Sequence, residues 1–452
     1  MTLSTRTLPV ADAGSLGRFE PANSLDHWEA AAAGEADAAS IESVATAARY
    51  LRETDVPVGF PTETVYGLAA DVTRSSAVRG IFSVKGRPSD NPLIVHVCDL
   101  DMVRGLLGTG EDGQPRELPA IYRPLVERFW PGPLTILLDV PDSGSGRWTL
   151  APEVTAGLRT FGCRLPDSPL ARTLIRLAQA PLAAPSANAS TRPSPTTAQH
   201  VVDDLDGRIV AVLDGGPCAV GVESTVVDGL CEPPVVLRPG GISMAQLRSV
   251  PGWEKVQRAY RDQSAGQPVD GTTATAPRAP GMKYKHYSPK ARVVLYEATG
   301  SSNHGDGGMV QDVVREIRSV QEVREAGSQH EGATRSLVVG VIRTTTWPAL
   351  GQLLRPIGPI GGNRGQKTEQ APGHTATYRL EAFALDGTTA ATVLELDLGR
   401  DQASVAHGLF SGLRDLDARG ADVILVEGLD DRADDIAAAV MNRLRKAASE
   451  VR

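Results

Sequence analysis

The sequence predicts an α/β protein with two domains, and three observations lead to this prediction. The chain has 452 residues, of which 41% are hydrophobic, so it is too long for one ordinary core and apolar enough for globular packing. Between residues 56 and 245, apolar runs typical of strands alternate with helical segments, which indicates a mixed α/β domain with a largely buried sheet. A second alternation starts at 291, after a stretch rich in Gly, Pro, Ser, Thr and Ala.

The elements of the first domain are predicted from hydrophobic periodicity and from Gly and Pro at the boundaries. A helix is expected over 40–53, and the segment 56–70 reads as a strand, a loop, and then a helix or strand. Further strands are expected at 92–97, 134–140, 158–165, 181–186, 208–214, 224–228 and 234–240. Further helices are expected at 74–84, 119–128, 168–179 and 195–204.

The second alternation predicts a smaller, Rossmann-like domain. Its strands are expected at 293–297, 336–344, 391–397 and 422–429, and its helices at 308–326, 401–418 and 433–449. Residues 355–376 read as an irregular loop. No GxGxxG follows the first strand, so dinucleotide binding has little support. The domain boundaries are therefore set at 1–26 for a flexible amino-terminal tail, 27–253 for the first domain, 254–290 for a linker and 291–452 for the second domain.

Composition excludes several classes of protein. The net charge of −8 argues against a protein that mainly binds nucleic acid, although it leaves room for a local basic groove. The cysteines have no CxxC spacing and the histidines no metal-ligand spacing, so neither a disulfide framework nor a zinc site is indicated. No apolar run approaches ~18 residues, the minimum for a transmembrane helix. We expect a cytoplasmic protein; a mitochondrial address in the Ser- and Thr-containing amino terminus is the alternative.

Four cations stand beside Gly or Pro or at the end of an apolar run: Lys85, Arg87, Arg164 and Arg238. If the strands form one sheet, these ends converge on a common concave face. Arg and Lys suit phosphate and carboxylate oxygens, and a Pro-bounded loop holding Ser186, Asn188 and Ser194 adds neutral donors. The pattern predicts a site for a nucleoside triphosphate that is not a P-loop, since GxxxxGK[ST] is absent.

Each of these residues also has a purely structural interpretation. Lys85 and Arg87 alone would be a solvated loop, and Arg164 or Arg238 alone a surface salt-bridge partner. His96, inside an apolar strand, would by default be a core histidine, and Cys163 a small buried side chain with no base paired to it. The number and order of the polar stretches together favour a functional site.

Seven stretches, read in order, resemble the threonylcarbamoyl-AMP synthase family, whose catalytic domain is called YrdC-like. They are PTETVYGL, KGRPSDNPLIVH, WPGPLTILL, RLPDSP, APSANAS with the following SPT, ESTVVD and LRPGG, and they cover about residues 40–250. The linker sequence KYKHYSP and the ending VMNRLRKAA resemble the longer, two-domain form of the family. The resemblance implies a YrdC-like twisted mixed sheet with a basic central groove, followed by a Rossmann-like domain.

The resemblance also implies an activity and a set of site residues. The family joins L-threonine, bicarbonate or CO2, and ATP into threonylcarbamoyl-AMP, with release of pyrophosphate. Lys85 and Arg87 would be catalytic, acting on the phosphates of ATP. The nucleotide site implied in this way comprises Lys85, Arg87, Asn91, Thr160, Ala184, Ser186, Ser194, Arg238 and Tyr287. The threonine site implied comprises Thr64, His96, Arg164 and Ser224.

The expected cofactor is Mg²⁺ carried by ATP, with no metal bound by protein side chains. The product would feed the tRNA threonylcarbamoyl transferase complex that modifies adenosine 37 of tRNA, with at most a weak RNA contact and no membrane. Three alternatives are an RNA-binding or regulatory YrdC-like protein without adenylate synthesis, a ligand-binding protein that has lost activity, and a carbamoyl-transferring hydrogenase maturation protein. The last class carries zinc fingers, which the missing CxxC pairs argue against.

The end of the linker, PGMKYKHYSP, is too aromatic and basic for a passive spacer. We expect it to close over the groove of the first domain, with Tyr287 and His286 near the nucleotide, so that water is kept from the adenylate. The alternative is that Tyr284 and Tyr287 pack at the junction of the two domains.

Overall fold

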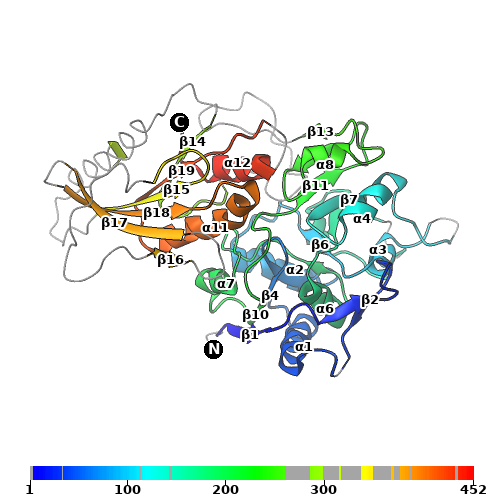
Figure 1. Ribbon diagram of the computed structural model, residues 1–452. Helices are drawn as coiled ribbons and strands as arrows, with labels where there is room; N and C mark the ends of the chain where they lie inside the picture. Colours follow the sequence, from blue (N-terminus) through cyan, green and yellow to red (C-terminus); the bar gives the residue numbers. More distant parts are fainter. Residues whose placement is uncertain are drawn as a thin grey trace. The chain divides into compact units, whose positions relative to one another are not determined.

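The computed structural model describes residues 4–32, 34–110, 113–141, 145–259, 286–298, 315–316, 337–349, 368–370, 377–385, 389–432 and 436–452. The chain forms two compact units, the first built mainly from residues 4–259 and the second mainly from Tyr287 onward. Figure 1 shows the elements of both units along the chain. None of the helices in these ranges has the length and apolar character needed to span a bilayer.

The first unit is a mixed sheet with helices. Its strands are β1 Arg6–Pro9, β2 Gly17–Phe19, β3 Trp28–Ala30, β4 Val58–Pro61, β5 Tyr66–Asp71, β6 Ile94–His96, β7 Leu134–Asp139, β8 Thr160–Arg164, β9 Leu182–Ala183, β10 Ala211–Asp214, β11 Thr225–Asp228, β12 Val235–Arg238 and β13 Gln257–Arg258. Its helices are α1 Ala38–Glu53, α2 Ser75–Lys85, α3 Leu100–Leu107, α4 Arg123–Phe129, α5 Pro152–Thr155, α6 Pro169–Ala178, α7 Ala198–Leu205 and α8 Met244–Arg248, with a 3-10 turn at Ala120–Tyr122.

The strands of this unit, apart from the β2–β3 hairpin, form an 11-stranded sheet in the order β1-β10-β4-β5-β9-β6-β8-β7-β11-β12-β13. Pairing is parallel between β6 and β8 and antiparallel between β7 and β8, so the sheet is mixed as predicted. Strand β4 is buried throughout and β7 is buried except at Asp139, which explains why they read as continuous apolar runs rather than as an alternating pattern. Helix α1 contacts α6, and α2 contacts β5.

Helices α1 and α6 begin where the sequence supplies a capping side chain. Asp37 accepts a hydrogen bond from the Ser40 amide at 2.8 Å at the start of α1, and Ser168 caps α6, whose first residue is Pro169. Helix α2 ends at Gly86, which has a φ of 63° and so adopts the left-handed conformation that glycine favours. This turn makes Lys85 the last residue of α2.

From residue 4 onward, the prediction that residues 1–26 form a flexible tail is wrong. Strand β1 pairs in parallel with β10, with Arg6 opposite Ala211 and Pro9 opposite Asp214. Strands β2 and β3 form a hairpin in which Trp28 is only 2% exposed. The segment is ordered by pairing and packing with residues far along the chain, which local composition does not reveal.

The second unit contains β14 Arg292–Tyr296, β15 Leu337–Arg343, β16 Thr368–Gln370, β17 Thr377–Leu385, β18 Thr389–Asp397, α11 Gln402–Ala418, β19 Val423–Glu427, α12 Ile436–Ala447 and β20 Glu450–Val451. The sheet order is β16-β17-β18-β15-β19-β14-β20, and the pairs from β18 to β20 are parallel. This confirms a Rossmann-like parallel sheet.

Strands β16 and β17 were not predicted. They add an antiparallel hairpin edge to the parallel sheet, with Thr377 opposite Asp397 and Leu385 opposite Thr389. The expectation of an irregular loop over 355–376 is therefore wrong at residues 368–370. The predicted helix at 308–326 lies outside the described residues apart from 315 and 316.

Candidate active site

The site is built around two neighbouring strand ends, those of β6 and β8. The parallel register places His96 opposite Arg164, the last residue of each strand. The His96 ring is 3% exposed and packs edge-on against Phe60, with a centroid separation of 6.3 Å. Burial, with the nearby charges of Arg164 and Arg238, lowers the pKa of His96 to about 3. The imidazole is therefore neutral at physiological pH, because burial and the positive charges of Arg164 and Arg238 both disfavour its protonation.

Arg164 is held in place by the loop between β4 and β5. Its Nη1 donates to Thr64 Oγ1 at 2.8 Å, its Nη2 to Glu63 Oε1 at 2.5 Å and its Nε to the Gly132 carbonyl at 3.2 Å. Its side chain is only 4% exposed. The interpretation of Arg164 as a surface salt-bridge partner is therefore wrong, because this ion pair lies in the interior.

The Glu63–Thr64 loop is itself fixed by backbone hydrogen bonds to a distant segment. The Val220 amide donates to the Glu63 carbonyl at 2.7 Å, and the Gly221 amide donates to the Thr64 carbonyl at 3.0 Å. Thr62 Oγ1 and Thr64 Oγ1 lie 2.8 Å apart. The side chains of 63 and 64 thus face Arg164 from a well-supported loop.

Ser224 connects Arg238 with the interior of the sheet. Arg238 donates from Nε and Nη2 to the Ser224 carbonyl at 3.1 and 2.9 Å, and from Nη2 to Ser224 Oγ at 3.1 Å. Ser224 Oγ also lies 2.8 Å from Thr135 Oγ1. The neighbouring residue, Glu223, accepts a hydrogen bond from Ser194 Oγ at 2.6 Å. Residues from two predicted stretches, 184–196 and 222–228, therefore meet at this position.

Lys85 lies at the carboxyl end of α2 and is 4% exposed, which contradicts its interpretation as part of a solvated loop. Its ammonium donates to the carbonyl oxygens of Ser186 and Asn188 at 2.5 and 2.6 Å. The Ser190 amide in turn donates to the Lys85 carbonyl at 2.8 Å. Lys85 therefore clamps the Pro-bounded loop to the end of α2.

The remaining nucleotide residues predicted in the first unit lie along the same strands and loops. Arg87 donates from Nη2 to the Pro92 carbonyl at 3.1 Å, while Asn91 is 8% exposed. The Ala184 amide donates to the Ile94 carbonyl at 3.0 Å, next to the strand that bears His96. Thr160 starts β8 and Arg164 ends it, so alternation along the strand puts both on one face, about 13 Å apart.

Tyr287 belongs to the second unit, whereas the other predicted site residues belong to the first. Its ring is 1% exposed and packs against Phe410, with a centroid separation of 5.2 Å, and the Arg443 guanidinium lies 6.0 Å from the ring centre. Tyr284 and residues 260–285 lie outside the described residues. A buried ring of this kind supports a packing role for Tyr287 within its own unit.

Three residues at the site were not singled out from the sequence: Glu63, Glu223 and Thr135. Glu63 belongs to the motif PTETVYGL and Glu223 to the motif ESTVVD, so both lie in stretches that the sequence marks as part of the site. The signal in the sequence that could have indicated a functional role for Glu63 is its position between two threonines, in a loop that follows a buried strand. Cys163, as predicted, is a fully buried side chain, and burial raises the pKa of its thiol far above the usual range.

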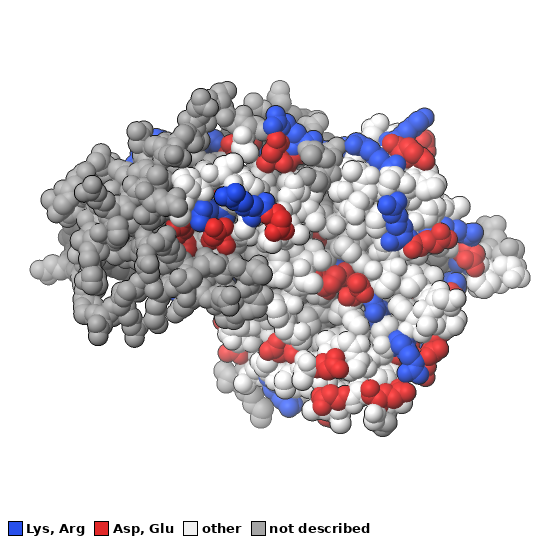
Figure 2. All heavy atoms as spheres, in the orientation of Figure 1, with Lys and Arg blue, Asp and Glu red and all other residues white. Residues whose placement is uncertain are grey.

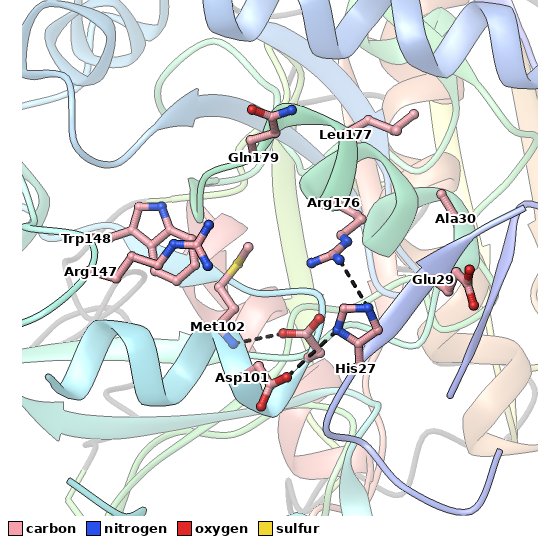
Figure 3. A pocket seen from close by; sticks show the side chains of 11 residues that line it. His27, Glu29, Ala30, Asp101, Met102, Arg147, Trp148, Arg176, Leu177 and Gln179 are labelled. Atoms are coloured by element: carbon pink, nitrogen blue, oxygen red, sulfur yellow. Dashed lines mark hydrogen bonds and ion pairs between the residues drawn. The ribbon is translucent and has the colours of Figure 1, made fainter. Parts of the chain in front are cut away.

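A separate cavity of about 560 Å³ lies beside β3, α3 and α6 and contains none of the predicted residues (Figure 3). Its polar groups face one another: Arg176 Nη2 lies 3.1 Å from His27 Nε2, and His27 Nδ1 lies 3.8 Å from an Asp101 carboxylate oxygen. Arg147 stacks over the ring of Trp148. Within the described ranges, no group of three or more His, Cys, Asp or Glu is arranged to hold a metal ion.

Two family models cover most of the chain. One, described as "Telomere recombination" and covering the Sua5, YciO and YrdC proteins, matches residues 51–240. The other, described as "Threonylcarbamoyl-AMP synthase, C-terminal domain", matches residues 242–449.

Relatives and solved structures agree with this match. The chain is 42% identical to threonylcarbamoyl-AMP synthase of Schizosaccharomyces pombe over 90% of this chain and 88% of the relative. It is 38% identical to the Bacillus subtilis enzyme of the same name over 90% of this chain and 92% of that protein. The structure resembles Pyrococcus abyssi Sua5 complexed with L-threonine, with a TM-score of 0.64 and 33% identity over 91% of this chain and 95% of that one. The chain therefore belongs to the threonylcarbamoyl-AMP synthase family.

Proposed function

We propose that this protein is an L-threonylcarbamoyladenylate synthase, which condenses L-threonine, bicarbonate or CO2, and ATP into threonylcarbamoyl-AMP and pyrophosphate. The observation that carries the proposal is the buried cluster at the ends of β6 and β8, where Arg164 meets Thr64 and His96 stands opposite Arg164. It lies in a chain that is 42% identical to a curated synthase over 90% of its length.

The threonine site is proposed at Thr64, His96, Arg164 and Ser224. A guanidinium binds a carboxylate through paired N–H donors, so Arg164 would hold the carboxylate of threonine. Neutral groups then remain for the threonine hydroxyl, since Thr64 and Ser224 carry hydroxyls and the His96 imidazole is uncharged. A site that hydrogen-bonds a substrate hydroxyl discriminates strongly against an analogue that lacks it.

The nucleotide site is proposed at Lys85, Arg87, Asn91, Thr160, Ala184, Ser186, Ser194 and Arg238. Tyr287 is not included, because its buried ring packs against Phe410 within the second unit. The clamp of Lys85 on the carbonyls of Ser186 and Asn188 supports a shared location for the residues of the 85–91 and 184–194 stretches. Lys85 and Arg87 would stabilise charge on the phosphates as the bond to pyrophosphate breaks.

The reaction needs positioning and charge stabilisation rather than a covalent nucleophile. The carbamate oxygen of N-carboxythreonine attacks the α-phosphorus of ATP, and pyrophosphate leaves as the new P–O bond forms. Mg²⁺ would enter with ATP and neutralise the leaving group. Cys163, the one nucleophilic side chain on β8, is buried and keeps its proton, so it takes no part.

The alternative of an RNA-binding or regulatory protein without synthesis has less support. The relatives are named as synthases, and the described residues on the face seen in Figure 2 carry Lys and Arg interspersed with Asp and Glu rather than a broad basic surface.

We propose that the product serves the tRNA threonylcarbamoyl transferase complex. Free thiols at all four cysteines support a reducing compartment, for which we propose the cytoplasm.

Pyrophosphate release from MgATP tests the proposal. Release should require both L-threonine and bicarbonate, and mass spectrometry should detect threonylcarbamoyl-AMP in an equal amount. Release that is independent of threonine, or an absence of release with RNA binding that weakens as salt increases, would replace the proposal with the RNA-binding alternative.

A further inference from the structure

The Glu63–Arg164 pair is a charged pair inside the proposed threonine site. Glu63 Oε1 lies 2.5 Å from Arg164 Nη2, and the two side chains are 10% and 4% exposed. Burying two charges is costly unless hydrogen bonds satisfy their donors and acceptors, so a carboxylate in this position needs an explanation beyond stability.

Arg164 has donors left for a ligand. A guanidinium carries five N–H groups, and the described hydrogen bonds use one each on Nε, Nη1 and Nη2. One N–H on each terminal nitrogen is not used in these bonds, and these are the donors that Arg164 would offer to a second carboxylate. Glu63 therefore leaves room on Arg164 for the carboxylate of an amino acid.

Glu63 also has an acceptor left for a ligand. Its second oxygen, Oε2, is buried and accepts no hydrogen bond from the part of the chain that the structure describes. An unpaired carboxylate oxygen in the interior is unfavourable, and a cationic donor would satisfy it. An α-amino acid bound through its carboxylate carries such a donor, because its ammonium is attached to the carbon next to the carboxylate.

The hydroxyls and the imidazole at the site are poor proton acceptors. Thr64, Thr135 and Ser224 offer only hydroxyls. His96 Nδ1 lies 3.3 Å from the Ile94 carbonyl, and its pKa of about 3 makes the ring a much weaker base than an ordinary imidazole. Glu223 already accepts a hydrogen bond from Ser194 at 2.6 Å. Glu63 differs from these groups because it is a carboxylate paired with Arg164 whose second oxygen, Oε2, accepts no hydrogen bond from the described residues.

We propose that Glu63 binds the ammonium of threonine and acts as the general base that makes the amine nucleophilic, an assignment that rests on the proposed function. One proton passes from the ammonium nitrogen to Glu63 Oε2, and then to water. The nitrogen lone pair forms the N–C bond to bicarbonate, and the departing hydroxide takes the second N–H proton and leaves as water. Threonine ammonium and bicarbonate thereby become carbamate, water and one proton, without redox change.

The test compares the two directions of the reaction in wild type and Glu63→Gln. The glutamine amide can still accept a hydrogen bond from Arg164 but cannot take a proton. In the forward direction, kcat/KM for threonine should fall about 10²- to 10⁴-fold near pH 7, the usual contribution of a general base. The deficit should shrink by about tenfold per pH unit as the solution supplies neutral amine up to about pH 9. Formation of ATP from threonylcarbamoyl-AMP and pyrophosphate should be unchanged, because that step moves no proton.

Charged and titratable groups around Glu63 are Arg164 on β8, Arg172 on α6 and Cys218 after β10. Burial raises the pKa of Cys218 far above its usual range, so its thiol should not titrate between about pH 6.5 and pH 9. A rise of activity with pH in this interval therefore reports on the amine of the substrate.

A matched control and a second variant keep the proposal falsifiable. Glu153→Gln removes a carboxylate that pairs with Arg79 at 2.7 Å outside the site, and it should leave both directions intact. Glu63→Asp keeps a carboxylate but withdraws it by one methylene, so it should lose only the forward direction, and it serves if the Gln variant fails to fold. Unchanged forward kinetics, or an equal loss in both directions at every pH, would overturn the role of Glu63. Absence of threonine-dependent pyrophosphate release in the wild type would instead overturn the proposed function.

Discussion

Replacing Lys85 with methionine should weaken both the fold and the reaction, and the structure gives the size of the first effect. The substitution keeps an unbranched apolar side chain, one atom shorter, but removes the ammonium that donates to the Ser186 and Asn188 carbonyls at 2.5 and 2.6 Å. Each buried carbonyl left without a donor costs about 1–3 kcal/mol, so two cost about 2–6 kcal/mol. Relief from burying a charge offsets part of this cost, and we expect a net loss of about 2 kcal/mol.

The effect on catalysis is separate. Removing a charge-assisted hydrogen bond to a phosphate in the transition state costs about 2–4 kcal/mol, which is about 30- to 1000-fold in rate. Denaturant unfolding measures the first effect, and pyrophosphate release at saturating threonine and bicarbonate measures the second. Lys255→Met, at an exposed lysine of the same unit, should change neither. A Lys85→Met protein of wild-type stability would refute the clamp, and one with wild-type turnover and ATP affinity would refute the interaction with phosphate.

Three further outcomes are expected. Valine should be a far poorer substrate than threonine in pyrophosphate release, by about 10⁴-fold if the hydroxyl is hydrogen-bonded, and equal turnover would contradict the proposed pocket. The free energy of unfolding should fall as the pH drops from about 6.5 toward 3, because the unfolded chain binds a proton that buried His96 does not. Each pH unit costs about 1.4 kcal/mol, and His96→Gln should reduce this slope in denaturant titrations. Tyr287→Ala should lower the free energy of unfolding by about 3–5 kcal/mol, because its buried ring packs against Phe410; unchanged denaturant unfolding would contradict this packing.

The sequence predicted the parts of the fold that carry strong local patterns. Strands such as β7 and β8 are continuous apolar runs, and α1 has helical periodicity with a capping Asp37, so their positions could be inferred within a few residues. Strand β17 lacks the continuous apolar run that is typical of the parallel strands in the second domain, so its pattern did not predict a strand. TYRLEAFAL mixes polar and apolar residues and pairs antiparallel at one side of the sheet.

For the candidate site, the sequence predicted which residues belong to it but not how their side chains are arranged. The stretches that hold Thr64, His96, Arg164 and Ser224 were recognisable in order. Which side chains meet depends on register and on contacts between residues about a hundred positions apart, such as Glu63 with Arg164. Formal charges in the sequence do not reveal such partners, so a salt bridge of Arg164 could be considered, but neither Glu63 as its partner nor its buried position could be predicted.

The position of β1 has a practical consequence for handling the protein. This short strand borders β10, and without it β10 would present unpaired amide and carbonyl groups along Val212 and Leu213. Exposed strand borders of this kind recruit strands from other molecules and promote aggregation. Strand β1 itself is a poor template for such pairing, because it has only four residues and ends in Pro9, which has no amide hydrogen. Trimming the first ten residues to obtain a shorter protein should therefore reduce the yield of monomer, whereas a fusion partner joined ahead of them leaves the border closed.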